Sequence, residues 1–165
     1  MGQIDARLAE LSLVIPGPDA PLADYVPWVQ AGNLLFVSGQ VSFDGGALVR
    51  GQLSAADHAE GSPPQVAPGS ELERARHAAR LCGIALIAQA RAAIGDLDRV
   101  LRVVKLVGFV NGRGDFEQAP IVINACSGLM AEVFGDAGRH ARSAVTVANL
   151  PFGALVEVEA VFEIR

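Results

Sequence analysis

The chain has 165 residues, which is enough for one compact domain with its own core and too few for two. Hydrophobic residues make up 51% of it, too many for a disordered chain, and the longest uncharged stretch, residues 25–43, is broken by Pro, Gly and polar residues, which argues against a membrane span. The net charge is -5 and aromatic residues amount to 5%, so neither a positive field nor stacking platforms favour nucleic acid as a partner. We therefore expect a single domain over residues 1–165.

The first residues predict a short amphipathic helix. Residues 1–13 place Asp5, Arg7 and Glu10 among apolar side chains and lack the charged-then-apolar order of a secretory signal. Cys82 and Cys126 lie far apart without CxxC spacing, so buried, reduced thiols in a cytoplasmic protein are the default expectation. A disulfide or a nucleophilic cysteine is the less favoured alternative.

The next segment predicts a β-hairpin and then a loop. The run NLLFVSGQVSF from residue 33, the Asp44-Gly45-Gly46 turn and the following ALV are typical of two strands joined by a tight turn, because glycine supplies the positive φ that such turns need. Residues 53–70 are rich in Pro, Gly, Ser and Ala and have no apolar period. They predict a long surface loop.

Along the chain, one predicted helix precedes a central strand and a second predicted helix follows it. Ser70 is a plausible cap for a helix over about residues 71–94, which Gly95 ends. Residues 100–111 are β-branched and apolar on both faces, which suits a strand covered on both sides. A second helix is predicted over about residues 119–134, and its first thirteen residues carry no charge.

The C-terminal part predicts two more strands, over residues 143–148 and 155–164. In the last strand apolar residues alternate with glutamates, so one face joins the core and the other is polar. The fold class is therefore α+β, a two-layer sandwich in the order β-β-α-β-α-β-β. Helices on one side cannot cover both faces of an apolar central strand, so we expect a closed homo-oligomer that covers the free face of the sheet.

Arg142 and Glu157 are the candidate catalytic residues. Arg142 opens the first of these two strands, and Glu157 lies on the polar face of the second. A guanidinium binds a carboxylate through two parallel hydrogen bonds, and a glutamate can orient or deprotonate a water molecule. From spacing alone, solvated surface charges or a plain ion pair explain both residues better.

Three segments carry a resemblance to a known family. YVPWVQAGNLLFVSGQ (25–40), ARSAVTVANLP (141–151) and VEVEAVFEI (156–164), in this order and separation, resemble the signature blocks of the Rid family of reactive intermediate deaminases, also called the YjgF or L-PSP family. The loop at 53–70 is long beside the shorter members, so the chain resembles a longer branch. The resemblance implies a chorismate-mutase-like fold and a homotrimer with active sites in the clefts between subunits.

The resemblance also implies a reaction. Family members hydrolyse reactive 2-imino and 2-enamino acids to 2-keto acids and ammonia, without a metal or other cofactor. By similarity Arg142 holds the substrate carboxylate, Glu157 positions the attacking water or moves its proton, and the pocket is lined by Tyr25, Ser38 and Asn124. An iminium carbon is already electrophilic, so orientation and a placed water are the main requirements.

Ala144 is the main departure from the family pattern, because deaminase members commonly carry Cys there; its backbone N–H can still donate to a substrate. Ala144 therefore favours one alternative, a trimeric protein that binds a small carboxylate in the same clefts without turning it over. A third reading is an endoribonuclease, which the L-PSP name implies for some members and which the acidic composition disfavours. His140, close to Arg142, is either a proton shuttle or, more often for such a residue, a loop anchor.

Overall fold

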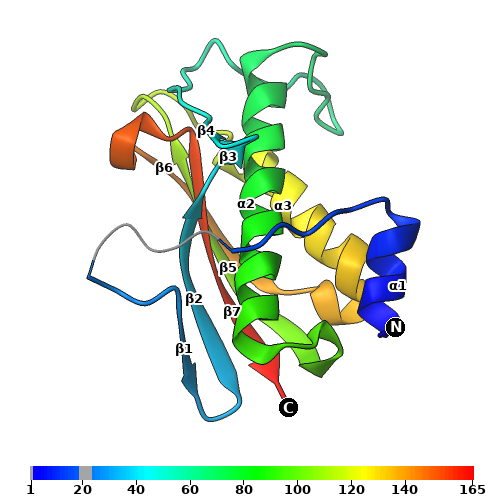
Figure 1. Cartoon of the computed structure of the whole chain (residues 1–165). Helices are drawn as coiled ribbons and strands as arrows, with labels where there is room; N and C mark the ends of the chain where they lie inside the picture. The colour runs from blue at the N-terminus through cyan, green and yellow to red at the C-terminus, as the bar shows by residue number, and fades with distance from the viewer. Residues whose placement is uncertain (1, 19–23) are drawn as a thin grey trace.

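The computed structural model describes residues 2–18 and 24–165 and has the predicted two-layer α+β architecture (Figure 1). A five-stranded sheet in the order β1-β2-β7-β5-β6 forms one layer, and helices α2 and α3 form the other. The helices are α1 (Gln3–Glu10), α2 (Glu71–Ile94) and α3 (Ala119–Phe134), with short 3-10 turns η1 (Leu97–Arg99), η2 (Gly135–Gly138) and η3 (Pro151–Gly153). The sheet strands are β1 (Trp28–Ala31), β2 (Leu34–Val41), β5 (Val100–Asn111), β6 (Ala141–Val147) and β7 (Val156–Ile164), and β3 (Phe43–Asp44) pairs with β4 (Ala47–Leu48) in a small second sheet.

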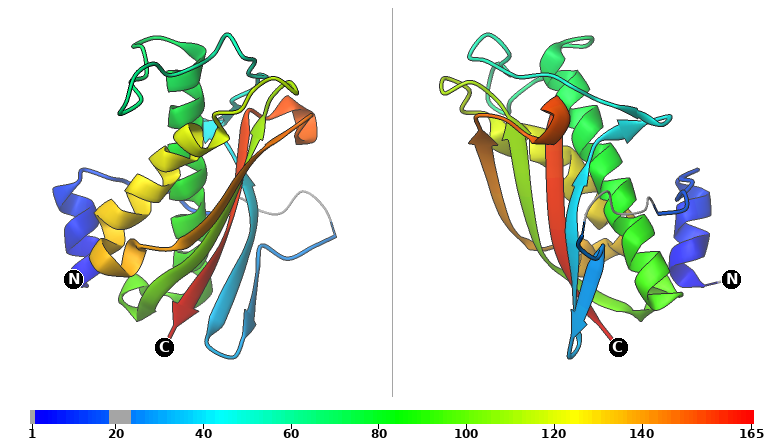
Figure 2. Two further views of the ribbon diagram at one scale, coloured as in Figure 1. Left: turned by 180° about the vertical axis from the view of Figure 1, so that it is seen from behind. Right: turned by 60° about the vertical axis from the view of Figure 1, so that its left-hand side comes forward.

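Strand β7 lies at the centre of the sheet, and β5, which the sequence suggested as the central strand, lies between β7 and edge strand β6. Strand β5 pairs parallel to β6 and antiparallel to β7, so the last two strands flank β5 and are not neighbours. Along the chain the main sheet and its helices read β1, β2, α2, β5, α3, β6, β7, which confirms the predicted order. Both helices cover the same face of the sheet (Figure 2).

The predicted hairpin is wrong in one respect. The segment from residue 33 splits at buried Ser42, and only Phe43–Asp44 pairs with the strand after the Gly-Gly turn. The hairpin of the main sheet is instead β1 with β2, joined at Gly32, whose φ is +63°. Strand β1 was not expected because it is a short edge strand, mostly exposed, and so has no alternation of apolar and polar residues.

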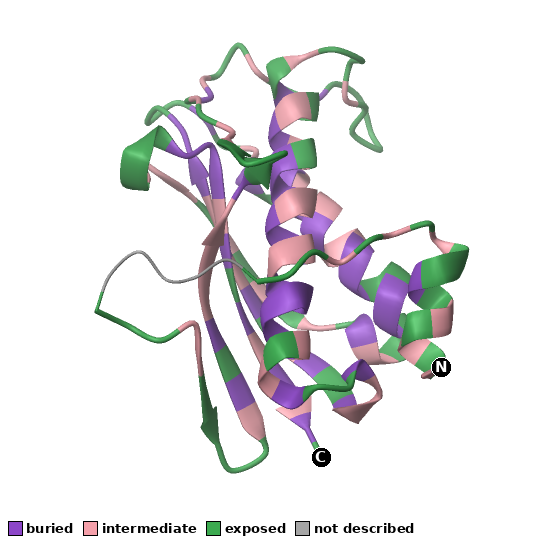
Figure 3. Ribbon diagram, viewed as in Figure 1, coloured by how far each residue is buried: buried purple, intermediate pink, exposed green. Residues whose placement is uncertain are grey.

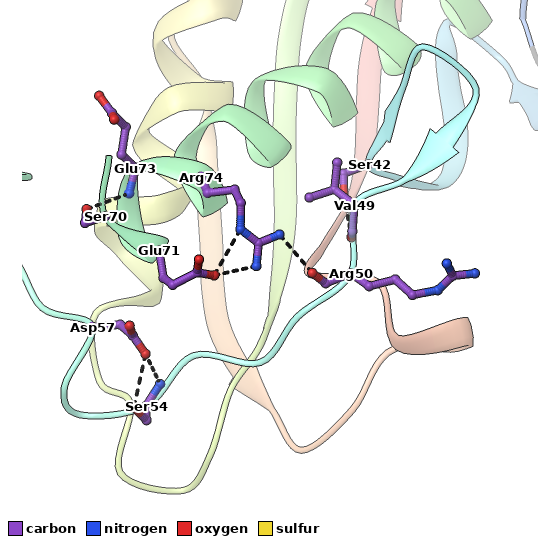
Figure 4. Close-up of polar contacts among 9 residues, drawn as sticks. All are labelled: Ser42, Val49, Arg50, Ser54, Asp57, Ser70, Glu71, Glu73 and Arg74. Carbon is purple, nitrogen blue, oxygen red and sulfur yellow. Dashed lines mark hydrogen bonds and ion pairs between the residues drawn. The ribbon is translucent and has the colours of Figure 1, made fainter. Parts of the chain in front are cut away.

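The helix ends follow the capping residues in the sequence. The Ser70 hydroxyl accepts a hydrogen bond from the Glu73 N–H at 3.2 Å (Figure 4), and Gly95 ends α2 with a φ of +77°. The predicted N-terminal helix forms as α1, Met1 of that prediction lying outside the described residues. Asp98 fastens α1 to the body, because its carboxylate accepts from the backbone N–H groups of the first turn, and these contacts lower its pKa.

The core lies between the sheet and the two long helices (Figure 3). Close approach of α2 to α3 depends on Gly83, since a Cβ there would lie 3.1 Å from the Cys126 sulfur. Cys82 and Cys126 are free and buried, as expected from the sequence. The predicted loop at 53–70 forms, although Leu53 within it is fully buried.

The outer face of the sheet carries exposed apolar side chains. Val29 is 53% exposed, Phe36 44% and Val145 45%. No helix of the described chain lies over the outer face of the sheet (Figure 2). Within a single chain the helices therefore cover only one face of β5 and of its neighbours in the sheet. Among the described residues no helix is both long and apolar enough to cross a membrane.

Candidate active site

Arg142 reaches from edge strand β6 to helix α3. Its register partner on β5 is Leu106, a core residue, so its side chain projects from the helix-covered face. Nη1 donates to Asn124 Oδ1 at 2.8 Å and to Ser127 Oγ at 3.2 Å. The structure thus brings together two residues that the family resemblance implicates, Arg142 and Asn124.

The rest of the Arg142 guanidinium has no partner among the residues that the structure describes. No hydrogen bond engages its Nε or Nη2 there, and it has no carboxylate partner. Other arginines pair with carboxylates, for example Arg80 with Glu132 at 2.8 Å and Arg91 with Asp5 at 2.6 Å. Nε and Nη2 of Arg142 can therefore donate two parallel hydrogen bonds to the carboxylate of a ligand.

His140 lies next to this arrangement. Its Nδ1 is 2.6 Å from the Gly138 carbonyl oxygen, and its Nε2 is 3.0 Å from Ser127 Oγ. The contact with Gly138 is the loop-anchoring role, because it ties the imidazole to the turn before β6. Sequence reasoning missed Ser127, which joins His140 to Arg142.

Glu157 occupies the opposite face of the sheet. It alternates with buried Val156 and Val158, and its carboxylate rests against Gly39 of β2, where a Cβ would collide with it. Partial burial raises the pKa of Glu157, and the neighbouring Glu159 raises it further. A carboxylate with a raised pKa can take up and return a proton nearer neutral pH than an ordinary glutamate.

Ser38 and Tyr25 come from β2 and from the segment before β1, which lie close together. Ser38 directly precedes Gly39, and its hydroxyl donates to the Val26 carbonyl at 2.9 Å, which fixes the segment after Tyr25. Tyr25 is 52% exposed and borders a cleft of about 740 Å³. The cleft is also lined by Gly39, Gln40 and, on α2, Leu81, Ile84 and Ala85.

The candidate residues form two groups that do not face each other within one chain. We call Arg142, Asn124 and Ala144 the arginine half, and Glu157 with Ser38 the glutamate half. Tyr25 belongs to neither, because it borders the cleft against α2, and the lining of that cleft among the described residues includes neither Glu157 nor Ser38. Arg142 pairs in register with Leu106, three residues before Phe109, the partner of Glu157 on the same strand. Because successive side chains alternate, Arg142 and Glu157 project from opposite faces of the sheet.

Ala144 lies two residues after Arg142 on β6, on the same face, and packs against the core. Cys126 cannot supply the thiolate that a cysteine at position 144 would offer. Burial raises the pKa of the Cys126 thiol to about 12, although the charge of Arg142 opposes the rise. Burial likewise raises the pKa of Cys82. In the part of the chain that the structure describes, no three His, Cys, Asp or Glu side chains gather where they could hold a metal ion.

Comparisons with known proteins agree with this fold. Residues 5–164 match the family described as "YjgF/chorismate mutase-like, putative endoribonuclease". Protein TCP17 of Trypanosoma cruzi is 42% identical over 166 residues, covering 99% of this chain and 96% of the relative.

Two solved structures are similar over almost their whole length. Atu1372 of Agrobacterium tumefaciens, described as a protein of unknown function, is 40% identical with a TM-score of 0.81, covering 98% of this chain and 92% of that one. A Shewanella oneidensis protein, which carries the same endoribonuclease description, is 29% identical with a TM-score of 0.85, covering 99% and 100%. The chain thus belongs to the YjgF/chorismate-mutase-like family and has its fold.

Proposed function

We propose that this protein hydrolyses reactive 2-imino and 2-enamino acids to 2-keto acids and ammonia, in clefts between the subunits of a homotrimer. The observation that carries the proposal is the half-buried guanidinium of Arg142, whose Nη1 is held by Asn124 and Ser127 while Nε and Nη2 have no partner among the described residues. Such a fork suits the carboxylate that every 2-imino acid carries.

Glu157 supplies the proton transfers in this proposal. Its carboxylate takes a proton from a water molecule as the water oxygen bonds to the imine carbon. It then gives that proton to the nitrogen, which leaves an amino alcohol. Glu157 next takes the hydroxyl proton and passes it to the same nitrogen, so that the C–N bond breaks, ammonia leaves and the keto group forms. A raised pKa suits a group that must act first as base and then as acid. Binding in the cleft supplies orientation.

The two halves of the site require two chains in this scheme. Arg142 and Glu157 project from opposite faces of one sheet, so a cleft that holds both groups is built from the arginine half of one subunit and the glutamate half of another. The exposed apolar side chains of the outer sheet face, Val29, Phe36 and Val145, supply the surface for that contact. A Val145→Lys variant that sediments at the same mass as the wild type would count against this interface.

A coupled assay tests the proposed reaction. An amino-acid oxidase generates the imine, semicarbazide traps it, and purified wild-type or Arg142→Ala protein is added. We expect the wild type to suppress semicarbazone formation and Arg142→Ala to lose that effect. Arg139→Ala is the matched control, because Arg139 is exposed and pairs with Asp136. Full activity of Arg142→Ala would contradict the proposed role.

Ala144 supports a second candidate, a trimer that binds small carboxylates without turnover. This candidate predicts thermal stabilisation by 2-keto acids together with unchanged trapping of every imine. Nothing comparable favours RNA cleavage, because the arginines of the groove between α2 and α3 are engaged within the chain. Arg74 pairs with Glu71 (Figure 4), Arg80 pairs with Glu132, and Arg76 donates to the Ile121 carbonyl.

A further inference from the structure

Arg142, Ser127 and His140 form a continuous chain of hydrogen bonds beside the arginine half of the site. The three residues come from β6, from α3 and from the turn between them. Nη1 of Arg142 lies 3.2 Å from Ser127 Oγ, which lies 3.0 Å from His140 Nε2, and His140 Nδ1 lies 2.6 Å from the Gly138 carbonyl oxygen. All three contacts are partly buried.

When the His140 imidazole is neutral, the chemistry of the end groups sets the direction of every bond. The Gly138 carbonyl only accepts, so Nδ1 of His140 carries a proton, and in the neutral imidazole Nε2 must then accept. The Ser127 hydroxyl therefore donates to Nε2. The lone pairs of Ser127 Oγ can then accept a hydrogen bond from Arg142, which can only donate.

The carbonyl that sets this order is itself held in place. A Cβ on Gly138 would collide with the carbonyl group of Met130 on α3, so only glycine permits the close approach of this turn to the helix. Gly138 is buried. The turn, the imidazole and the hydroxyl are thus packed as one unit against α3.

We propose that Ser127 and His140 are positioning residues that orient the Arg142 guanidinium for the substrate carboxylate. Ser127 and Asn124 occupy Nη1, which directs Nε and Nη2 toward the ligand as a bidentate pair. His140 acts one step further away, because its Nε2 accepts the hydrogen bond from the Ser127 hydroxyl, which leaves Oγ as an acceptor for the arginine. The inference rests on the proposed function in so far as Arg142 binds the carboxylate.

A pair of imines that share a side chain tests the role. The leucine-derived 2-imino acid carries a carboxylate, and the imine made by oxidising 3-methylbutylamine does not. For Ser127→Ala we expect KM for the imino acid to rise about tenfold, the loss of one hydrogen bond to a charged group, with kcat within about twofold. The imine without a carboxylate should show no change. Ser127→Thr, which keeps the hydroxyl, should restore the wild-type KM.

His140→Phe tests the second link. It removes the acceptor of the Ser127 proton, so the KM for the imino acid should rise by several-fold while the imine without a carboxylate is unaffected. His58→Phe is the matched control, because His58 lies on the exposed loop. A loss of kcat for both imines in Ser127→Ala and Ser127→Thr alike would indicate a structural role and overturn the proposal.

A binding measurement separates this inference from the proposed reaction. Calorimetry with 4-methyl-2-oxopentanoate should give a Kd about tenfold weaker for Ser127→Ala than for the wild type and unchanged for Ser127→Thr. If no imine is hydrolysed and this difference in Kd persists, the reaction is wrong and the positioning role stands. If hydrolysis is normal and neither KM nor Kd depends on Ser127, the reaction stands and the positioning role is wrong. If the wild type neither hydrolyses the imines nor binds the keto acid, both are wrong.

Discussion

The two halves of the candidate site are built in different ways. The arginine half lies on the helix-covered face, where Arg142 is held by Asn124 and Ser127 of α3. The glutamate half lies on the open face, where Glu157 rests against a glycine and next to the charge of Glu159. The geometry of the arginine half is fixed by contacts within the chain, whereas the glutamate half is partly exposed to solvent.

This difference agrees with the roles that the proposed reaction gives to Arg142 and Glu157. A carboxylate anchor benefits from a guanidinium already oriented before the ligand arrives, because less freedom is then lost on binding. A proton-transfer group needs a pKa near the working pH, and burial against a second subunit would raise the pKa of Glu157 beyond the value that one chain alone imposes. In the proposed trimer a second subunit would therefore act mainly on the pKa of Glu157, because Arg142 is already held within its own chain.

The largest effect should come from Glu157→Gln. The amide fills the same space and cannot accept a proton, so we expect kcat for imine hydrolysis to fall by about a hundredfold or more. KM should change little, because the carboxylate anchor is on Arg142. The semicarbazide trapping assay measures both parameters, and Glu163→Gln on the same face of β7 is the control. A Glu157→Gln protein with wild-type kcat would remove this residue from the mechanism.

Mixing the two defective halves should restore activity. Arg142→Ala keeps Glu157, and Glu157→Gln keeps Arg142, so a hetero-oligomer of both contains some sites with two intact halves. With random assembly about one site in four is intact, and co-expression should recover about a quarter of wild-type activity. If each site were built within one chain, co-expression would recover no activity. That result would mean that Arg142 and Glu157 of one site come from the same subunit, and it would contradict the proposed cleft.

Gly39→Ala should have a smaller effect. Its Cβ would occupy the position of the Glu157 carboxylate, which must swing away, and the φ of Gly39 lies outside the left-handed region, so the backbone accepts alanine. We expect activity to fall by about tenfold, the order of loss for a misplaced catalytic group, with a near-normal unfolding midpoint. Gly114→Ala is the control, because a Cβ there meets nothing within 4 Å. Unchanged activity would mean that the position of the carboxylate is not critical.

Much of the fold was predictable because its signals are local. Ser70 and Gly95 mark the ends of α2, and the β-branched run of β5 gives its length directly. Strand β1 was missed because an exposed edge strand of four residues has no apolar period. Its place in the sheet is set by pairing with β2 and not by its own composition.

The site was predictable only in part, and for a physical reason. Arg142 and Glu157 were found through motif resemblance, but Ser127 and Gly39 act through contacts with residues on other elements. One local signal for Ser127 exists, since Asn124 and Ser127 are the polar side chains of α3 before Glu132 and are three residues apart, which places them on one face. No comparable signal separates Glu157 from Glu159, because the distinction depends on the pairing of β7 with β2.

The smallest effect concerns the charge of Glu159, which raises the pKa of Glu157. Glu159→Gln removes that charge, so the pKa of Glu157 should fall. If hydrolysis needs the carboxylate form, kcat/KM rises with pH through this pKa, and the rising limb should move to lower pH in Glu159→Gln. The pH profile of kcat/KM for the leucine-derived imino acid measures the shift. If the rising part of the kcat/KM profile stays at the same pH in Glu159→Gln, a group other than Glu157 causes it.

The stability of the protein provides a second readout of the same charge. A carboxyl group whose pKa is higher in the folded than in the unfolded state binds more protons when folded, so this residue makes the free energy of unfolding fall as pH rises from its unfolded to its folded pKa. In Glu159→Gln the pH range between the unfolded and the folded pKa of Glu157 becomes narrower, and in Glu157→Gln this contribution to the pH dependence disappears. Urea unfolding of the three proteins across this pH range should therefore show the steepest loss of stability in the wild type. Identical slopes would mean that the open-face glutamates are too solvated to affect one another, and the contrast between the two halves would then rest on Arg142 alone.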